Sequence, residues 1–500
     1  MKGLLTRNEL KRDLSRAVCW SLLFVFAAHA YAYFNPLFSG DSLSLRLGAD
    51  REKLTLAGRY LLPVYGALRG ELATPLTVGL ISCACLAVSV SLIAEMLGIR
   101  GRLTLPLACA ILTTNAGVTG ENLFEFYAAD GSFLALLLIV LALYLAARLR
   151  GVRRFACALP VCFALGLDTN VLSVAYFLTF ASLLLALTDR KDSRIALTNC
   201  LWMAAAIAIG ALLHAVGYRL LLGRRGLSPV AGATALSSLG ALSSPSAAAQ
   251  AAIYPVASLL APDTIHPLVC GGLYALLLLY EIWALVALLR KAAAGRIATV
   301  CALIALVPLA VNPAGYGAQG NAPARCTWAF YLLPVLALAL LERSEPRRPG
   351  LRGCAVSLCF LLAVNAIIFS NQLYLKRHLE AQSTLSVMTR VIGRAEREPG
   401  FAPGSTPVAV MGDLNGGDVS VQRVGFEHLA AFDGNNYALG TAKDALWYAW
   451  TMLGYPFNFV SDYEWAQLMQ DSRVQEMPAF PAEGYCQMID GTLVIRLGPD

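Results

Sequence analysis

The chain has 500 residues, of which 57% are hydrophobic and 14% are charged, and its mean hydropathy is +0.61. Ordinary soluble domains have about 45–50% apolar and about 25% charged residues, so this composition excludes a soluble cytosolic enzyme and a disordered chain. The net charge of +7 would suit nucleic acid, but the cations lie in short segments that bracket apolar runs, which argues against that partner.

Apolar runs of membrane-spanning length recur along the chain. Five basic residues precede the first run, 17–34, and the positive-inside rule therefore predicts a cytoplasmic N-terminus. Eleven spans are predicted in all. After the first they cover 75–97, 103–118, 131–148, 155–168, 171–188, 196–218, 267–289, 297–313, 326–342 and 353–371.

The distribution of Lys and Arg supports this alternation. The segments assigned to the inside hold 21 of these residues, and the loops assigned to the outside hold 9, with the last 9 in the tail. Because basic residues are retained on the cytoplasmic side, the orientation follows, and an odd number of spans places residues 372–500 outside.

The composition changes after the last span. From Lys376 the chain is polar, and 377–397 carries Leu379, Leu385, Met388, Val391 and Ile392 on one face of a predicted helix. Strands are predicted at 407–411 and at 485–489 and 492–497, the latter two as a hairpin across Asp490-Gly491. The sequence therefore predicts a mostly α, polytopic helical bundle over 1–371 and a small α/β domain over 372–500.

Cysteine usage points to neither a disulfide framework nor zinc. Eleven of the thirteen cysteines lie inside apolar runs, and no Cys-x-x-Cys pair or Cys/His cluster occurs. Only Cys326 and Cys486 are expected to be accessible.

Asp41 stands out in the large first outside loop, 35–74, seven residues after Phe34 ends the first span. A carboxylate at the lip of the bilayer can serve as a general base that deprotonates an acceptor hydroxyl. The alternative is a Ser-Gly-Asp turn or a helix N-cap for 42–47.

The second outside loop, 115–130, carries Glu121, Glu125 and Asp130 without a cation. Oxygen ligands of this kind suit a divalent cation such as Mg²⁺. They could equally pair with an arginine from another segment of the chain. The alternative is a solvated acidic loop.

Arginines in the remaining outside loops are candidates for binding a lipid phosphate. Arg325 ends the loop 312–325, and Arg224 lies in the long excursion 219–266. Arginines at span ends also serve as interface anchors, which is their commoner role.

Some ionisable residues lie well inside predicted spans. Glu281 is about halfway through an apolar run, and a charge there is functional by default unless it is protonated and structural. His29 and His214 are expected to be hydrogen-bonded core residues.

Short motifs resemble one family. The segment 39–42 (Ser-Gly-Asp-Ser), followed by Gly58-Arg59-Tyr60, is similar to the bacterial and phage serotype-converting glucosyltransferases, the type II O-antigen glucosyltransferases. The segments 371–375, 380–385 and 388–390 resemble the stretch that follows the last span in that family.

The resemblance implies a membrane glycosyltransferase of the GT-C architecture in the bacterial inner membrane, with a periplasmic C-terminal domain. It assigns the catalytic acidic residue of the first outside loop to Asp41 and a donor-phosphate contact to Arg59. It further implies a polyprenyl-phosphate-linked glucose donor and a surface polysaccharide acceptor such as O-antigen.

The sequence thus favours an enzyme in which Asp41 is the base, Arg59 with Arg325 or Arg224 contacts the donor phosphate, and Glu121, Glu125 or Asp130 holds the acceptor or a cation. The tail would help to bind the acceptor glycan. A transporter or flippase that depends on Glu281 is the second interpretation, and a non-catalytic scaffold is the third. A divalent cation is the one cofactor to be tested, and the partners are membrane lipid, the lipid-linked donor and the glycan.

Overall fold

The computed structural model describes residues 7–38, 51–188, 193–228, 230, 233, 244–290, 292–313, 322–344, 349–415, 425–430, 432–439 and 442–498. The chain is mostly helical, and among the described residues eight helices are long and apolar enough to cross a membrane. The chain divides into two compact units. In the described part, the first contains 7–34, 51–122 and most residues from 127 to 371, and the second contains 35–38, 123–126 and the residues from 372 onward.

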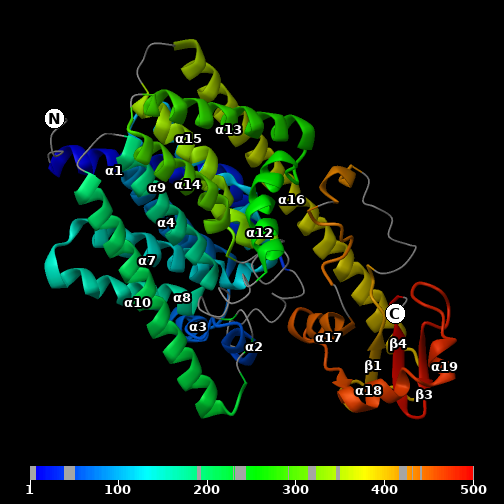
Figure 1. Ribbon diagram of the computed structural model, residues 1–500. Coiled ribbons are helices and arrows are strands. Elements are labelled where there is room, and N and C mark those ends of the chain that lie inside the picture. Colours follow the sequence, from blue (N-terminus) through cyan, green and yellow to red (C-terminus); the bar gives the residue numbers. More distant parts are fainter. Residues whose placement is uncertain are drawn as a thin grey trace. The chain divides into compact units, whose positions relative to one another are not determined.

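Most helices of the first unit follow the predicted apolar runs, and three others lie in the predicted outside loops 35–74 and 219–266; Figure 1 shows their arrangement. In chain order they are α1 (Arg7–Phe34), α2 (Arg51–Leu56), α3 (Leu62–Arg69), α4 (Pro75–Leu97), α5 (Thr104–Thr114), α6 (Ala116–Phe124), α7 (Ala129–Arg148), α8 (Ala158–Leu167), α9 (Leu172–Thr188), α10 (Ser193–Arg225), α12 (Pro245–Leu260), α13 (Pro267–Leu289), α14 (Ala294–Ala310), α15 (Leu332–Arg343) and α16 (Pro349–Ala395). Short 3-10 helices include η3 (Gly151–Cys157), η4 (Thr169–Val171) and η7 (Ala324–Tyr331).

The eight long helices coincide with eight of the eleven predicted spans, and the difference falls on 103–118, 155–168 and 297–313. Helix α5 has 11 residues and α8 has 10. At about 1.5 Å per residue such helices are roughly 15–17 Å long, which is about half of the hydrocarbon thickness. Helix α14 has 17 residues and lies near the lower limit for spanning.

Helix α4 packs between α1 and α7 in the first unit (Figure 1). Its sequence is apolar on all sides, and Leu86, Val90 and Ile93 are fully buried. A helix that is hydrophobic all round is expected to be a buried or membrane-spanning helix, and α4 meets that expectation.

The break between α5 and α6 is completed by a single side chain. The Nδ2 group of Asn115 donates to the carbonyls of Ile111 and Leu112, each at 3.0 Å, and its Oδ1 accepts from the amides of Gly117 at 3.0 Å and Val118 at 3.2 Å. Helix ends leave such backbone groups without partners, so this amide satisfies the end of one helix and the start of the next.

The second unit contains the predicted strands. A four-stranded sheet has the order β2-β1-β4-β3, with β1 (Pro407–Met411) parallel to both β2 (Asn458–Phe459) and β4 (Thr492–Arg496). Strand β3 (Cys486–Ile489) is antiparallel to β4 and pairs Ile489 with Thr492. Asp490 and Gly491 have φ of 49° and 83°, as a two-residue hairpin turn of the predicted kind requires. The predicted hairpin is confirmed.

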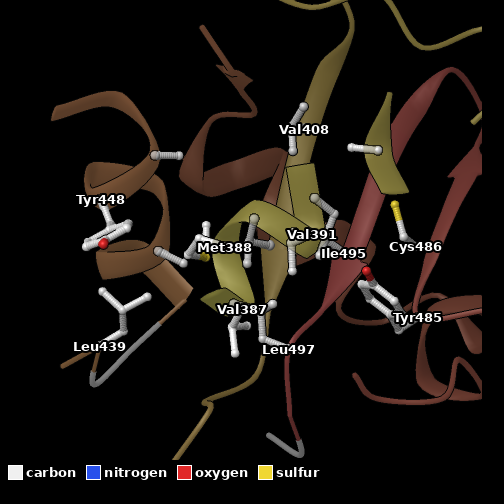
Figure 2. Close-up of a cluster of buried hydrophobic side chains, with 14 of the residues drawn as sticks. Val387, Met388, Val391, Val408, Leu439, Tyr448, Tyr485, Cys486, Ile495 and Leu497 are labelled. Carbon is white, nitrogen blue, oxygen red and sulfur yellow. The ribbon is translucent and has the colours of Figure 1, made fainter. Parts of the chain in front are cut away.

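The core of this unit lies between α16 and the sheet (Figure 2). Val387, Met388 and Val391 of α16 pack with Val408 of β1 and Ile495 of β4. Helices α17 (Ala442–Thr451), α18 (Asp462–Leu468) and α19 (Ser472–Gln475) complete the unit.

The predicted apolar face of 377–397 is correct in part. Met388 and Val391 are buried, but Leu385 is 45% exposed, and Val387 takes its place in the core. The buried face of the helix is thus rotated by part of a turn from the predicted one. The spacing of apolar residues in 377–397 is compatible with two neighbouring faces of the helix.

Two predictions about cysteine are wrong. Cys326 is 9% exposed and Cys486 is fully buried, so neither is accessible. Cys486 lies in β3 with its side chain in the core shown in Figure 2. Cys326 is the first residue of a predicted span and Cys486 lies in a predicted strand, and the chain packs both side chains inward.

A buried charge cluster in the second unit is paired internally. The Nη2 of Arg377 donates to Oδ2 of Asp433 at 2.9 Å, its Nη1 lies 3.0 Å from Oε2 of Glu380, and Lys376 contacts the same glutamate. Their side chains are at most 4% exposed. Buried charges of opposite sign in such contact offset one another's desolvation cost, so this cluster is structural.

Candidate functional site

Helix α6 lies against η7 because two glycines face the backbone of that segment. A Cβ on Gly117 would lie 2.6 Å from the amide nitrogen of Trp328, and a Cβ on Gly120 would lie 3.0 Å from that of Arg325. Both separations are below ordinary van der Waals contact. Residues without a side chain are therefore what allows Arg325 to lie beside the next turn of α6, which carries Glu121.

A cavity of about 420 Å³ opens at this contact. Its walls come from α6, α7, α9, η7 and the turn between α8 and α9. The lining residues are Gly117, Glu121, Ser132, Phe133, Leu136, Asp168, Asn170, Val171, Ser173, Val174, Arg325, Cys326 and Trp328. Small-molecule sites combine apolar walls with a few polar groups, and the lining of this cavity contains residues of both kinds.

Charged groups of both signs meet at the cavity. Glu121 is 6% exposed and interacts electrostatically with Asp168, Arg59 and Arg325. Burial raises the pKa of Glu121, and the nearby Asp168 raises it further, while Arg59 and Arg325 lower it. Because the carboxyl groups of Glu121 and Asp168 share a buried site, ionisation of one makes ionisation of the other less favourable. Glu121 therefore binds its proton more tightly than an ordinary glutamate does.

A chain of hydrogen bonds joins Arg59 to Glu121. Arg59 is 8% exposed, its Nε donates to the carbonyl of Leu167 at 3.2 Å, and its Nη2 donates to Oγ of Ser132 at 3.2 Å. The hydroxyl of Ser132 in turn hydrogen-bonds the carboxylate of Glu121. The other carboxylate oxygen, Oε1 of Glu121, is buried and has no hydrogen-bond partner within the described part of the chain.

Asp168 is held in place by its own backbone turn. It precedes η4, and its Oδ1 accepts from the amide of Asn170 at 3.0 Å. This N-cap fixes the side chain at the junction of α8 and α9, where it lines the cavity.

Comparison with known protein families decides the identity of the chain. Residues 30–341 match the family described as Glucosyl transferase GtrII. The chain belongs to this family. No curated protein and no solved structure gives a significant match. The resemblance read from the motifs at 39–42 and 58–60 is thereby confirmed, and the GtrII chain is a membrane protein of a glucosyltransferase family.

Three residues singled out from the GtrII sequence come together at the cavity: Glu121 and Arg325 line it, and Arg59 interacts with Glu121. Asp41 lies outside the described residues. Arg224 is exposed near the end of α10 and is not part of the cavity lining.

Asp130 and Glu125 have other surroundings. The carboxylate of Asp130 accepts from Nη1 of Arg69 at 2.6 Å and from the hydroxyl of Tyr65 at 2.8 Å. Arg69 is thus the arginine from another segment that pairs with Asp130, as one interpretation of the acidic loop expected. Glu125 is buried and belongs to the second compact unit.

Sequence reasoning missed Asp168 and Ser132. Asp168 lies between two apolar runs that were both read as spans, and a carboxylate at such a break was the available signal. Ser132 stands in an apolar run three residues before Ala135, and nothing in its spacing indicates a contact with Arg59. The proximity of 59, 121, 132, 168 and 325 depends on tertiary packing.

The intramembrane histidines have backbone partners, as predicted. His29 Nε2 lies 2.8 Å from the carbonyl of Thr113, and His214 Nε2 lies 3.0 Å from that of Gly58. Glu281 lies in α13, and its Oε2 is a buried atom for which the described ranges contain no hydrogen-bond partner. Among the described residues, no group of three His, Cys, Asp or Glu side chains is placed to hold a metal ion.

Proposed function

We propose that the chain transfers glucose from a polyprenyl-phosphate-linked donor to a surface polysaccharide such as O-antigen, at the outer face of the bacterial inner membrane. The observation that carries this proposal is the meeting of two arginines and two carboxylates at one cavity, in a chain of a glucosyltransferase family. The N-terminus is then cytoplasmic, the bundle has a GT-C-like architecture, and the C-terminal unit is periplasmic.

Arg59 and Arg325 are the groups that we assign to the donor phosphate. A guanidinium presents several N–H donors in a plane and matches phosphate oxygens in pairs. The phosphate leaves with the electron pair of the broken bond to the anomeric carbon, so its charge grows during the reaction. Fixed cations beside it stabilise that charge more in the transition state than in the ground state.

Asp41 is the general base of the proposal. The acceptor hydroxyl oxygen attacks the anomeric carbon and forms the new glycosidic bond, and its proton passes to the Asp41 carboxylate. Because phosphate is a competent leaving group, no acid is needed to protonate it. The support for Asp41 is its position in the sequence after the first span and the family motif around it.

The test compares the wild-type protein with Asp41→Asn and Arg325→Ala at matched membrane levels, in a bacterium that makes polyprenyl-phosphate glucose. Mass spectrometry of the surface polysaccharide should show a hexose increment with the wild type. Loss of a general base typically costs about 10²–10⁴ in rate, and loss of one stabilising donor about 10²–10³, so both variants should leave the polysaccharide nearly unmodified.

Asp50→Asn is the matched control, because Asp50 is the other aspartate in the loop 35–74. It should behave as the wild type does. Full transfer by Asp41→Asn would remove Asp41 as the base, and an unmodified polysaccharide with the wild type would reject the donor or the acceptor.

A transporter is the second candidate, and the unpartnered Oε2 of Glu281 in a candidate span is the observation that favours it. A charge or proton at such a site serves transport in many membrane proteins. Under this alternative Glu281→Gln abolishes function and Asp41→Asn does not, which is the reverse of the result expected for the enzyme.

A further inference from the structure

Oε1 of Glu121 is a buried acceptor at the wall of a cavity, and among the residues that the structure describes no group donates to it. Leaving such an atom unsatisfied destabilises a fold by about 1–3 kcal/mol, and more for a charged group. The hydrogen bonds of Arg59 go to the carbonyl of Leu167 and the hydroxyl of Ser132 and do not satisfy this oxygen. The atom is therefore placed to receive a hydrogen bond from a molecule that enters the cavity.

The rest of the lining fits one chemical class of ligand. Ser132, Asn170 and Ser173 add hydroxyl and amide groups on the polar side, and Asp168 adds a second carboxylate. Trp328 lines the cavity as well, and its Nε1 donates to the carbonyl of Leu112 at 3.1 Å, which fixes the indole. Hydroxyl-bearing rings bind where hydrogen-bonding groups oppose an aromatic surface, because they have polar edges and apolar faces.

From these observations we propose that the cavity is the subsite for the hexosyl ring of the donor, and that Glu121 binds one of its hydroxyl groups. The inference rests on the proposed function, which supplies the hexosyl donor, and goes beyond it by naming the residue that selects the sugar. Neighbouring groups then bind the phosphate and the sugar of the donor, because Arg325 and Glu121 line the same cavity.

The carboxylate is oriented for this role before the ligand arrives. Ser132 donates to Glu121 and accepts from Arg59, so one carboxylate oxygen is fixed and the other is left for the ligand. A group that is already oriented loses little entropy on binding, and a site built to bind a hydroxyl discriminates strongly against an analogue that lacks it.

The experiment combines protein variants with donor analogues. Purified full-length wild type and Glu121→Gln are assayed with polyprenyl-phosphate glucose and with four donors, each of which lacks one of the sugar hydroxyl groups at C2, C3, C4 or C6. A hydrogen bond to a charged group contributes a factor of about 10–100 in affinity, so one deoxy donor should lose that factor in kcat/KM with the wild type. With Glu121→Gln the same removal should cost much less.

Such coupling between the variant and one hydroxyl supports the proposal. If Glu121 were only structural, the loss in kcat/KM from the substitution and the loss from the missing hydroxyl would be independent of each other. Independent penalties for all four deoxy donors would overturn it. Absence of glucose transfer by the wild type would instead reject the proposed function, so the two failures are distinguishable.

Asp168→Asn provides a second variant in case Glu121→Gln fails to fold. Asparagine is as good an N-cap as aspartate, so the hydrogen bond to the amide of Asn170 is retained while the negative charge beside Glu121 is lost. It should change the preference among the deoxy donors, and an unchanged preference contradicts the subsite.

Glu95→Gln is the matched control. The Glu95 side chain is 5% exposed and pairs with Arg100 and Arg148, and it does not line the cavity. This variant should keep the wild-type preference among the five donors.

Discussion

The contact between α6 and η7 predicts a large effect from the smallest possible side chain. In Gly117→Ala, the added Cβ would lie 2.6 Å from the Trp328 amide nitrogen and 2.7 Å from its Cα. Both atoms belong to the backbone, so no side-chain rotation relieves the contact. Moving from 2.6 Å to the 3.4 Å of ordinary contact requires η7 and α6 to separate by 0.8 Å.

This displacement acts on the cavity directly, since Glu121 is on α6 and Arg325 is on η7. A misplacement of about 1 Å in a catalytic arrangement can cost about 10²-fold in rate. We therefore expect Gly117→Ala to lower glucose transfer by about two orders of magnitude. Overpacking of this kind also lowers the free energy of unfolding by about 1–3 kcal/mol.

The assay measures transfer from polyprenyl-phosphate glucose by the purified protein, together with its thermal unfolding in detergent. Gly272→Ala is the control, because Gly272 is also helical and an added Cβ there meets no atom within 4 Å. That change should raise stability slightly, by about 0.5–1 kcal/mol, and leave transfer unchanged. If Gly117→Ala transfers glucose as fast as Gly272→Ala, the close approach of the two backbones does not position the site.

Three further results follow from the structure. Arg69→Ala removes the partner of Asp130, and since their side chains are 2% and 0% exposed, thermal unfolding should show a loss of about 3–5 kcal/mol. Because the pKa of Glu121 is raised, its protonation should lower kcat/KM at a higher pH than the protonation of an ordinary glutamate would; in Glu121→Gln the acid limb of the pH–rate profile should therefore move to lower pH, where the Asp41 base titrates, and an unchanged limb would assign it to a group other than Glu121. Gly491→Ala meets no atom within 4 Å but retains a φ of 83°, so it should cost the second unit about 1–2 kcal/mol, measured as faster proteolysis of that unit in the full-length protein.

The strongly patterned elements were predictable from the sequence. Eight long apolar runs gave eight helices, and β1 and the hairpin across Asp490-Gly491 appear where alternation and turn residues indicated them. In each case the determining interactions are local. Two further predicted spans contain the short helices α5 and α8, since hydropathy registers apolar character and not helix length, and 11 or 10 residues are about half of what a complete crossing needs.

The sequence indicated which types of residue form the site, but not which individual residues line the cavity. Unpaired acidic residues in 115–130 signalled a site, but which of them meets an arginine depends on packing. Asp130 pairs with Arg69 and Glu121 interacts with Arg59, although both arginines come from the same predicted loop. Side-chain partners separated by 50 or more positions leave no trace in a hydropathy pattern, which is also why Asp168 was missed.

The amide of Asn115 has a consequence for side reactions. Four backbone groups at the break between α5 and α6 are satisfied by this one side chain, so none of them has to recruit a water molecule. Gly117, bonded to Asn115, also lines the cavity. An activated sugar in this cavity therefore meets fewer water molecules that could react in place of the acceptor hydroxyl. In Asn115→Ala, more of the glucose should be released by hydrolysis and less should be transferred to the polysaccharide.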